Sequence, residues 1–194
     1  MAIWGLFHDT ASDSGYNHRK SASAQRHRYV MNATKTPHAS VLFICTGNIC
    51  RSPTAHALLV HKAAAAGLTL EVDSAAVTDS ELGNPPDARS LAELRRRGIP
   101  MPAHRARRVT ADDFRRFDLV VGMTAAHVAT LNRMAPDAAH KIGLMMVHSA
   151  DHGAIDVPDP WYGTRTDFIE VFDMLDVAVD GLLDSLRRNH PQVS

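Results

Sequence analysis

The sequence has only two cysteines, no net charge and no long apolar run, and each absence excludes a class of protein. Cys45 and Cys50 lie too close together to cross-link a fold, so we expect free thiols and a cytoplasmic protein. Basic and acidic side chains number 21 each, so no overall positive field favours nucleic acid or an anionic membrane as a partner. The apolar runs are also far too short to cross a bilayer.

The chain does have enough apolar residues for a core, since 45% of its 194 residues are hydrophobic, which favours one globular domain. Residues 1–38 differ from the rest, because they are rich in Ser, Ala, His, Asn and Arg and show little periodic hydrophobicity. This segment lacks the order of a signal peptide and predicts a disordered N-terminal extension, in which Met31 is an alternative start. We expect the folded domain over residues 39–190, followed by a tail at 191–194.

From Val41 onward, segments of strand length alternate with segments of helix length. Strands are expected at 41–45, 68–72, 118–123 and 141–147. Helices are expected between Ser52 and Gly67 and over 87–97, 111–117, 125–135 and 167–188, with N-caps at Ser52, Thr110 and Thr124. The alternation indicates an α/β protein, a three-layer αβα sandwich with a four-stranded parallel sheet.

The stretch 41–56, VLFICTGNICRSPTAH, places a cysteine at the end of the first strand and an arginine six residues later. If this loop wraps, its N–H groups converge at the positive end of the next helix and form an anion site. We expect Gly47 to supply the backbone freedom for the curl, and Arg51 to fork two hydrogen bonds onto a phosphate-like oxyanion. The same field favours the thiolate of Cys45, a nucleophile for phosphoryl transfer, which Ser52 can stabilise.

Other interpretations of this loop fit less well. A Walker-type loop needs Gly-Lys-Ser/Thr, which is absent. A metal site needs more ligands beside Cys45 and Cys50; His56 and His61 lie five residues apart on one helix, so we expect surface or packing histidines. A buried cysteine in a turn, with Arg51 solvated, is the remaining alternative. We expect no metal and no cofactor.

Phosphate ester hydrolysis also needs an acidic residue, because the departing ester oxygen must take up a proton and the incoming water must later lose one. Asp159 in VPDPWYG is the candidate, because its loop follows the fourth strand and Pro158 and Pro160 stiffen it. Spacing alone does not separate this role from a plain turn, and Asp156 is an equally acidic neighbour.

VLFICTGNICRSPTA followed far downstream by DPWYG resembles the low-molecular-weight protein-tyrosine phosphatases. The likeness runs from about Val41 to Leu186 and includes GNPPDARSLAELRRRGI, HRARRVTADDF and FDLVVGM. It implies a phosphate-binding loop after the first strand, a cysteinyl-phosphate intermediate and no metal. It also implies hydrolysis of phosphotyrosine in a protein partner, for which a bacterial tyrosine kinase, an exopolysaccharide regulator and a host protein are all compatible candidates. We expect a monomer, although no motif in the sequence determines the oligomeric state.

Carried over by position, the resemblance implies three catalytic residues: Cys45 as nucleophile, Arg51 as phosphate-binding arginine and Asp159 as general acid. It implies that Ser74, paired with the loop asparagine, and His104 support the loop. Contact with phosphate or substrate is implied for Thr46, Gly47, Asn48, Ile49, Cys50, Ser52, Trp161 and Tyr162. In relatives the second loop cysteine, here Cys50, can form a reversible disulfide with the nucleophile, so redox sensitivity is expected.

The sequence departs from the family pattern at two places. Many members carry a large aromatic in one wall of the cleft, where this chain has Ser80 and Glu81, and an acid there would disfavour acidic peptides. Trp161 and Tyr162 are left for the opposite wall, with packing in the core as the alternative. Thr124 stands where relatives often have a supporting Asp.

Two rival functions share this loop. Arsenate reductases coupled to thioredoxin need two further cysteines, which this chain lacks, but a form using a small-molecule thiol needs only the first. A non-enzymatic phosphate-binding module would be expected to lose Cys45 or Asp159, and both are present. The aromatic pair in DPWYG favours an aryl phosphate over arsenate, so we expect a protein-tyrosine phosphatase.

Overall fold

The computed structural model describes residues 39–150 and 155–189. The expectations of a disordered extension at 1–38 and of a tail at 191–194 lie outside the described residues.

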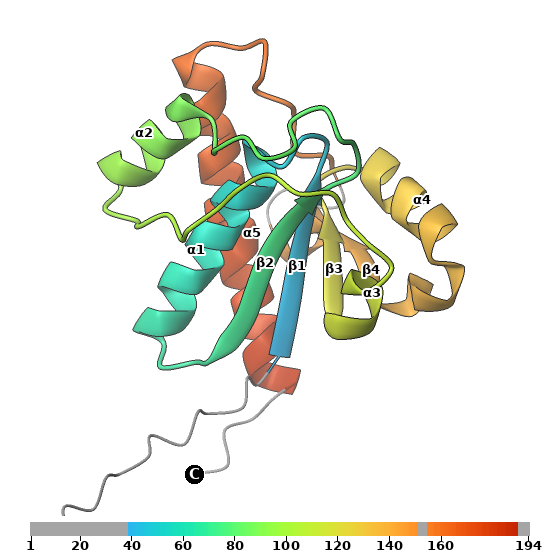
Figure 1. Ribbon diagram of the computed structural model, residues 1–194. Coiled ribbons are helices and arrows are strands. Elements are labelled where there is room, and N and C mark those ends of the chain that lie inside the picture. The colour runs from blue at the N-terminus through green and yellow to red at the C-terminus, as the bar shows by residue number, and fades with distance from the viewer. Residues whose placement is uncertain (1–38, 151–154, 190–194) are drawn as a thin grey trace, which may run out of the picture. The chain divides into compact units, whose positions relative to one another are not determined.

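The sheet has four strands, and all neighbouring strands are parallel (Figure 1). The strands are β1 (Ala39–Cys45), β2 (Leu70–Ala76), β3 (Leu119–Gly122) and β4 (Ile142–Leu144), in the spatial order β2-β1-β3-β4. The expected α/β class and the four-stranded parallel sheet are therefore confirmed. In this order β2 lies on one side of β1 and β3 lies on the other. The carboxyl end of β1 is therefore at a topological switch point, where α/β proteins place their binding sites.

Helices cover both faces of this sheet. They are α1 (Arg51–Ala65), α2 (Ala88–Arg96), α3 (Asp113–Arg116), α4 (Ala125–Met134) and α5 (Arg165–Asn189), with 3-10 turns η1 (Pro136–Lys141) and η2 (Met145–His148). Helices α1 and α5 pack on one face, whereas α3 and α4 pack on the other (Figure 1).

Strand β1 is buried along its whole length because it lies between two strands and two helical layers. Its side chains alternate between the two cores: Val41 and Phe43 join α1 and α5, whereas Leu42 and Ile44 join α3 and α4. Cys45 ends the strand in the first core. The nucleophile candidate is therefore fixed at the end of the most buried strand.

Several expected boundaries were wrong. Ser52 does not cap α1, because the helix begins at Arg51 and Cys50 takes the N-cap position. Thr110 donates to Asp113 and caps nothing, although Thr124 caps α4 as expected. The fourth strand ends at Leu144, because the following residues form η2.

Candidate active site

The loop that joins β1 to α1 surrounds the sulfur of Cys45. The backbone N–H of Asn48 donates to Cys45 Sγ at 3.2 Å, and Ser52 Oγ lies 3.0 Å from the same sulfur. Cys45 is buried, with 2% of its surface exposed. Donors that point at a sulfur stabilise it as a thiolate, so this geometry suits a nucleophile.

Asn48 organises the loop from its interior. Its side-chain Nδ2 donates to Ser52 Oγ and to Ser74 Oγ, each at 2.9 Å, while its Oδ1 accepts from Arg107 N at 3.1 Å. His104 Nε2 lies 2.9 Å from the Asn48 carbonyl oxygen. The structure thus brings together the residues for which loop support was expected, and every polar group of this buried asparagine side chain is used.

The left-handed residue of the loop is Asn48, with φ of 59°, and not Gly47. Asparagine is among the few residues that tolerate this conformation, which explains why the expected use of Gly47 was wrong. The small size of Gly47 matters instead, because a Cβ there would lie 2.8 Å from Glu81 Cγ.

Arg51 is buried at the start of α1 and its guanidinium reaches across the loop. Nη1 donates to the Val157 carbonyl and Nη2 to Thr46 Oγ1, both at 3.2 Å, and Nη2 also pairs with Asp159 Oδ2. Its Nε is buried and has no hydrogen-bond partner among the described residues. A buried donor without a partner is the arrangement expected of a group kept for an anionic ligand.

The two candidate acids of the loop before α5, Asp159 and Asp156, have different contacts in the structure. Asp159 lines the pocket above Cys45 and pairs with Arg51. Asp156 instead accepts from the Ala125 N–H at 2.7 Å, at the N-terminus of α4. Because that carboxylate serves a helix end, Asp159 is the acid that remains at the pocket.

The two thiols differ in environment. Burial, followed by the charge of Asp87, raises the pKa of Cys50 to about 12. Cys50 therefore stays protonated at neutral pH, while the loop donors converge on Cys45. Both cysteines are free thiols in the structure.

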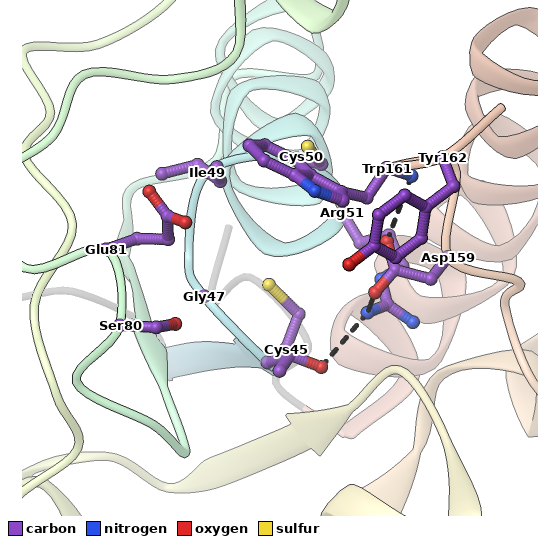
Figure 2. A pocket seen from close by; sticks show the side chains of 11 residues that line it. Cys45, Gly47, Ile49, Cys50, Arg51, Ser80, Glu81, Asp159, Trp161 and Tyr162 are labelled. Carbon is purple, nitrogen blue, oxygen red and sulfur yellow. Dashed lines mark hydrogen bonds and ion pairs between the residues drawn. The ribbon is translucent and has the colours of Figure 1, made fainter. Parts of the chain in front are cut away.

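A pocket of about 340 Å³ opens above Cys45, and Figure 2 shows its lining side chains. Ser80 and Glu81 lie on one side of Cys45, and Asp159 and Tyr162 lie on the other. Trp161 is 38% exposed and Tyr162 is 98% exposed, so neither belongs to the core. The pocket is also lined by Thr46, Gly47, Ile49, Cys50 and Arg51.

Two residues at the site carry no signal in the sequence that singles them out. His127, from α4, places Nε2 3.0 Å from Thr46 Oγ1. Burial, and next the charge of Arg51, lowers the pKa of His127 to about 4, so its ring is neutral and can accept from the Thr46 hydroxyl. Arg89, from α2, donates to the carbonyls of Trp161 and Gly163.

No three His, Cys, Asp or Glu side chains gather closely enough to hold a metal ion in the part of the chain that the structure describes. Across 39–150 and 155–189, no helix combines the length and apolar character needed to span a bilayer. His56 is buried and His61 is exposed, so they do not form a joint ligand pair.

Comparison with known proteins agrees with this geometry. A family model described as low molecular weight phosphotyrosine protein phosphatase matches residues 40–192. The low molecular weight protein-tyrosine-phosphatase of Streptomyces coelicolor is 39% identical over 153 residues, covering 76% of this chain and 93% of the relative. The human low molecular weight phosphotyrosine protein phosphatase is 39% identical over 138 residues, covering 69% and 86%. The crystal structure of YfkJ from Bacillus subtilis is similar with a TM-score of 0.75 at 35% identity, covering 81% of this chain and 99% of that one.

Proposed function

The chain belongs to the low molecular weight phosphotyrosine protein phosphatase family, and from this premise we propose that it hydrolyses phosphotyrosine in a protein substrate, and aryl phosphates, through a cysteinyl-phosphate intermediate. One observation carries the proposal: the sulfur of Cys45, the guanidinium of Arg51 and the carboxyl of Asp159 line one pocket. A nucleophile, an anion-binding group and an acid are the three groups that phosphate monoester hydrolysis requires.

In the first step the phosphate dianion docks against the loop N–H groups and Arg51. The thiolate of Cys45 attacks phosphorus in line, so a sulfur–phosphorus bond forms as the bond from phosphorus to the tyrosyl oxygen breaks. Asp159 donates its proton to that leaving oxygen. Arg51 neutralises charge on the phosphoryl oxygens throughout, which is the larger part of catalysis in such transfers.

In the second step a water molecule attacks the phosphorus of the cysteinyl phosphate. Asp159, now a carboxylate, accepts the proton of that water, and the electron pair of the sulfur–phosphorus bond returns to Cys45. Ser52 Oγ, 3.0 Å from the sulfur, stabilises the departing thiolate. Inorganic phosphate leaves and the thiolate is restored.

Arg51 and Asp159 form an ion pair in the structure, and this pair links binding to acid catalysis. A docking phosphate competes with the Asp159 carboxylate for the same guanidinium. Relief of the pair frees the Asp159 carboxyl to turn toward the leaving oxygen, so substrate binding itself positions the acid.

The partner we propose is a phosphotyrosine-containing protein, acted on by a monomeric cytoplasmic enzyme. The wall formed with Trp161 and Tyr162 supports an aryl ester, because an exposed aromatic pair offers a surface for stacking a phenyl ring. Reversible oxidation of Cys45 with Cys50 stays a prediction. Arsenate reduction with a small-molecule thiol is the alternative, and the Streptomyces coelicolor and human relatives named above are both called phosphatases.

Hydrolysis of p-nitrophenyl phosphate and of a phosphotyrosine peptide by the purified protein, under reducing conditions and with a chelator present, tests this function. We expect turnover by the unmodified chain and none by Cys45→Ser, whose melting temperature should stay close to that of the parent. Turnover that survives Cys45→Ser would overturn the proposal. Absence of turnover, together with thiol-dependent reduction of arsenate, would favour the alternative.

A further inference from the structure

We propose that Glu81 makes the enzyme select phosphotyrosine sites that carry a lysine or arginine within two positions of the phosphotyrosine. This inference rests on the proposed function, because it concerns the substrates of the same pocket. Glu81 stands on the wall opposite Asp159 and Tyr162 (Figure 2) and is partly exposed, so a bound peptide can reach it. Among the residues that the structure describes, Glu81 and Asp159 are the acidic residues that line the pocket.

The stem of Glu81 lies directly against the phosphate-binding loop. A Cβ at Gly47 would come within 2.8 Å of Glu81 Cγ and 3.5 Å of its Cβ, so only glycine leaves room for this side chain. The missing side chain at Gly47 therefore lets Glu81 lean over the loop. Glu81 is partly exposed and lines the pocket, so its carboxylate is accessible to a bound peptide.

The segment that carries Glu81 is tied to the site at both ends. On one side, the backbone N–H and the hydroxyl of Thr78 both donate to the Thr46 carbonyl, at 3.2 and 2.9 Å. On the other, Gly83 N donates to Ala106 O at 2.8 Å and Ala106 N donates to Asn84 O at 2.9 Å. A side chain on a segment pinned in this way loses little further freedom when a ligand contacts it.

One oxygen of the Glu81 carboxylate accepts a hydrogen bond, and the other has no hydrogen-bond partner in the described ranges of the chain. Asn84 Nδ2 donates to Glu81 Oε2 at 2.8 Å, which orients the group. Glu81 forms no ion pair within the residues that the structure describes, whereas Asp79 nearby lies 3.8 Å from Arg108. An oriented carboxylate without a cation is a ready partner for a basic side chain.

The two arginines that contact the loop of Asp159 and Trp161 in the described part of the chain already have acidic partners. Arg51 pairs with Asp159, and Arg89 pairs with Asp87 at 2.9 Å and donates to backbone carbonyls. Arg51 is buried at the bottom of the pocket. The Glu81 side of the pocket thus attracts basic residues that flank the phosphotyrosine and repels acidic ones. The phosphate group, which all these substrates have in common, binds at Arg51.

Three phosphotyrosine peptides that differ only in their flanks, with Lys, Ala or Glu beside the phosphotyrosine, provide the test. We expect kcat/KM to fall in that order for the unmodified chain. In Glu81→Gln, the ratio of kcat/KM for the Lys peptide to kcat/KM for the Glu peptide should drop about two- to fivefold, the usual contribution of a partly exposed charge pair. A higher salt concentration should also lower this ratio in the unmodified chain. Glu81→Lys should reverse the order.

Asp79→Asn is the matched control, because it removes the same charge from the same segment without touching the pocket. It should leave the ratio unchanged. An unaltered Lys-to-Glu ratio of kcat/KM in Glu81→Gln, or an equal change of this ratio in Asp79→Asn, would overturn the inference. In either case, turnover of all three peptides would still support the proposed function. If no peptide and no p-nitrophenyl phosphate is hydrolysed, the proposed function fails instead.

Discussion

At the scale of single residues, Asp159 lines the pocket and Asp156 does not, and this difference leads to a prediction. Asp159→Asn should lower kcat on a phosphotyrosine peptide by about a hundredfold to ten-thousandfold, because it removes the proton donor and keeps the shape of the side chain. Steady-state kinetics measures this. The effect should be smaller on p-nitrophenyl phosphate, whose leaving group needs less help from an acid.

Asp156→Asn is the paired variant, because Asp156 contacts the N-terminus of α4 and not the pocket. Its kcat should stay within a few-fold of the parent. Full activity in Asp159→Asn combined with a large loss in Asp156→Asn would reassign the acid.

Two short motifs of specific spacing predicted that Cys45, Arg51 and Asp159 would meet, and the three residues do line one pocket. Two other expectations for the loop after β1 were wrong: glycine as the flexible position and serine as a helix cap. Asn48 takes the left-handed conformation and Cys50 takes the cap position, while Ser52 makes the contact with the Cys45 sulfur that the sequence did predict. The conformational preference of a single residue does not predict its role where a buried hydrogen-bond network determines the backbone conformation.

At the scale of elements, α2 holds the loop that carries the acid. Its residue Arg89 stacks 4.3 Å from the ring centroid of Phe168 and 5.8 Å from that of Trp161, and it donates to the Trp161 and Gly163 carbonyls. Asp87, at the N-cap of α2, donates its N–H to the Ile49 carbonyl at 2.8 Å. Helix α2 thus connects the phosphate-binding loop with the loop of the acid.

Arg89→Met should therefore displace the acid while leaving the nucleophile in place. We expect kcat to fall about tenfold on phenyl phosphate and clearly less on p-nitrophenyl phosphate, because small displacements of a catalytic group are costly and the poorer leaving group depends more on the acid. Comparison of the two substrates in the same preparation checks this. Equal losses on both would indicate a general structural defect and contradict the positioning role.

The existence and order of the elements along the chain were predictable, because strand-like and helix-like periods alternate so regularly. The contact between Arg89 and the acid loop was not, since it joins residues 72 positions apart. The same holds for His127, which reaches Thr46 from another helix, 81 positions away. Long-range polar contacts leave no local pattern in a single sequence.

At the scale of the whole molecule, buried neutral histidines make stability depend on pH. Burial lowers the pKa of His56 and of His127 from 6.5 to about 4 in the folded state. The unfolded chain therefore binds more protons than the folded chain between pH 6.5 and 4, so the free energy of unfolding falls as pH falls through this window. At pH 5 each histidine should cost about 2 kcal/mol relative to neutral pH.

Urea unfolding at pH 7.5, 6 and 5 measures this dependence. His56→Gln should flatten the slope of stability against pH, whereas His61→Gln, at an exposed position of the same helix, should leave the slope as it is. Equal slopes in all three proteins would show that His56 is protonated in the folded state. The carboxylates of Asp87, Glu93 and Asp113 have lowered pKa values, so their contribution is lost only at still lower pH.

The parallel sheet with helices on both faces followed from the alternation of elements, but the spatial order β2-β1-β3-β4 did not, because it depends on which side of β1 each connection takes. That order places Cys45 at the switch point. The position of the pocket is thus a property of the topology, and its chemistry is a property of two short motifs.

The most direct test of the account is to trap the intermediate. The protein is mixed with an aryl phosphate, quenched in acid within milliseconds, digested and analysed by mass spectrometry, with Asp159→Asn included to slow hydrolysis. We predict phosphate on the peptide that contains Cys45, bound to the Cys45 sulfur, and none in Cys45→Ser. Turnover without a phosphorylated cysteine, or phosphate on any other residue, would contradict the mechanism.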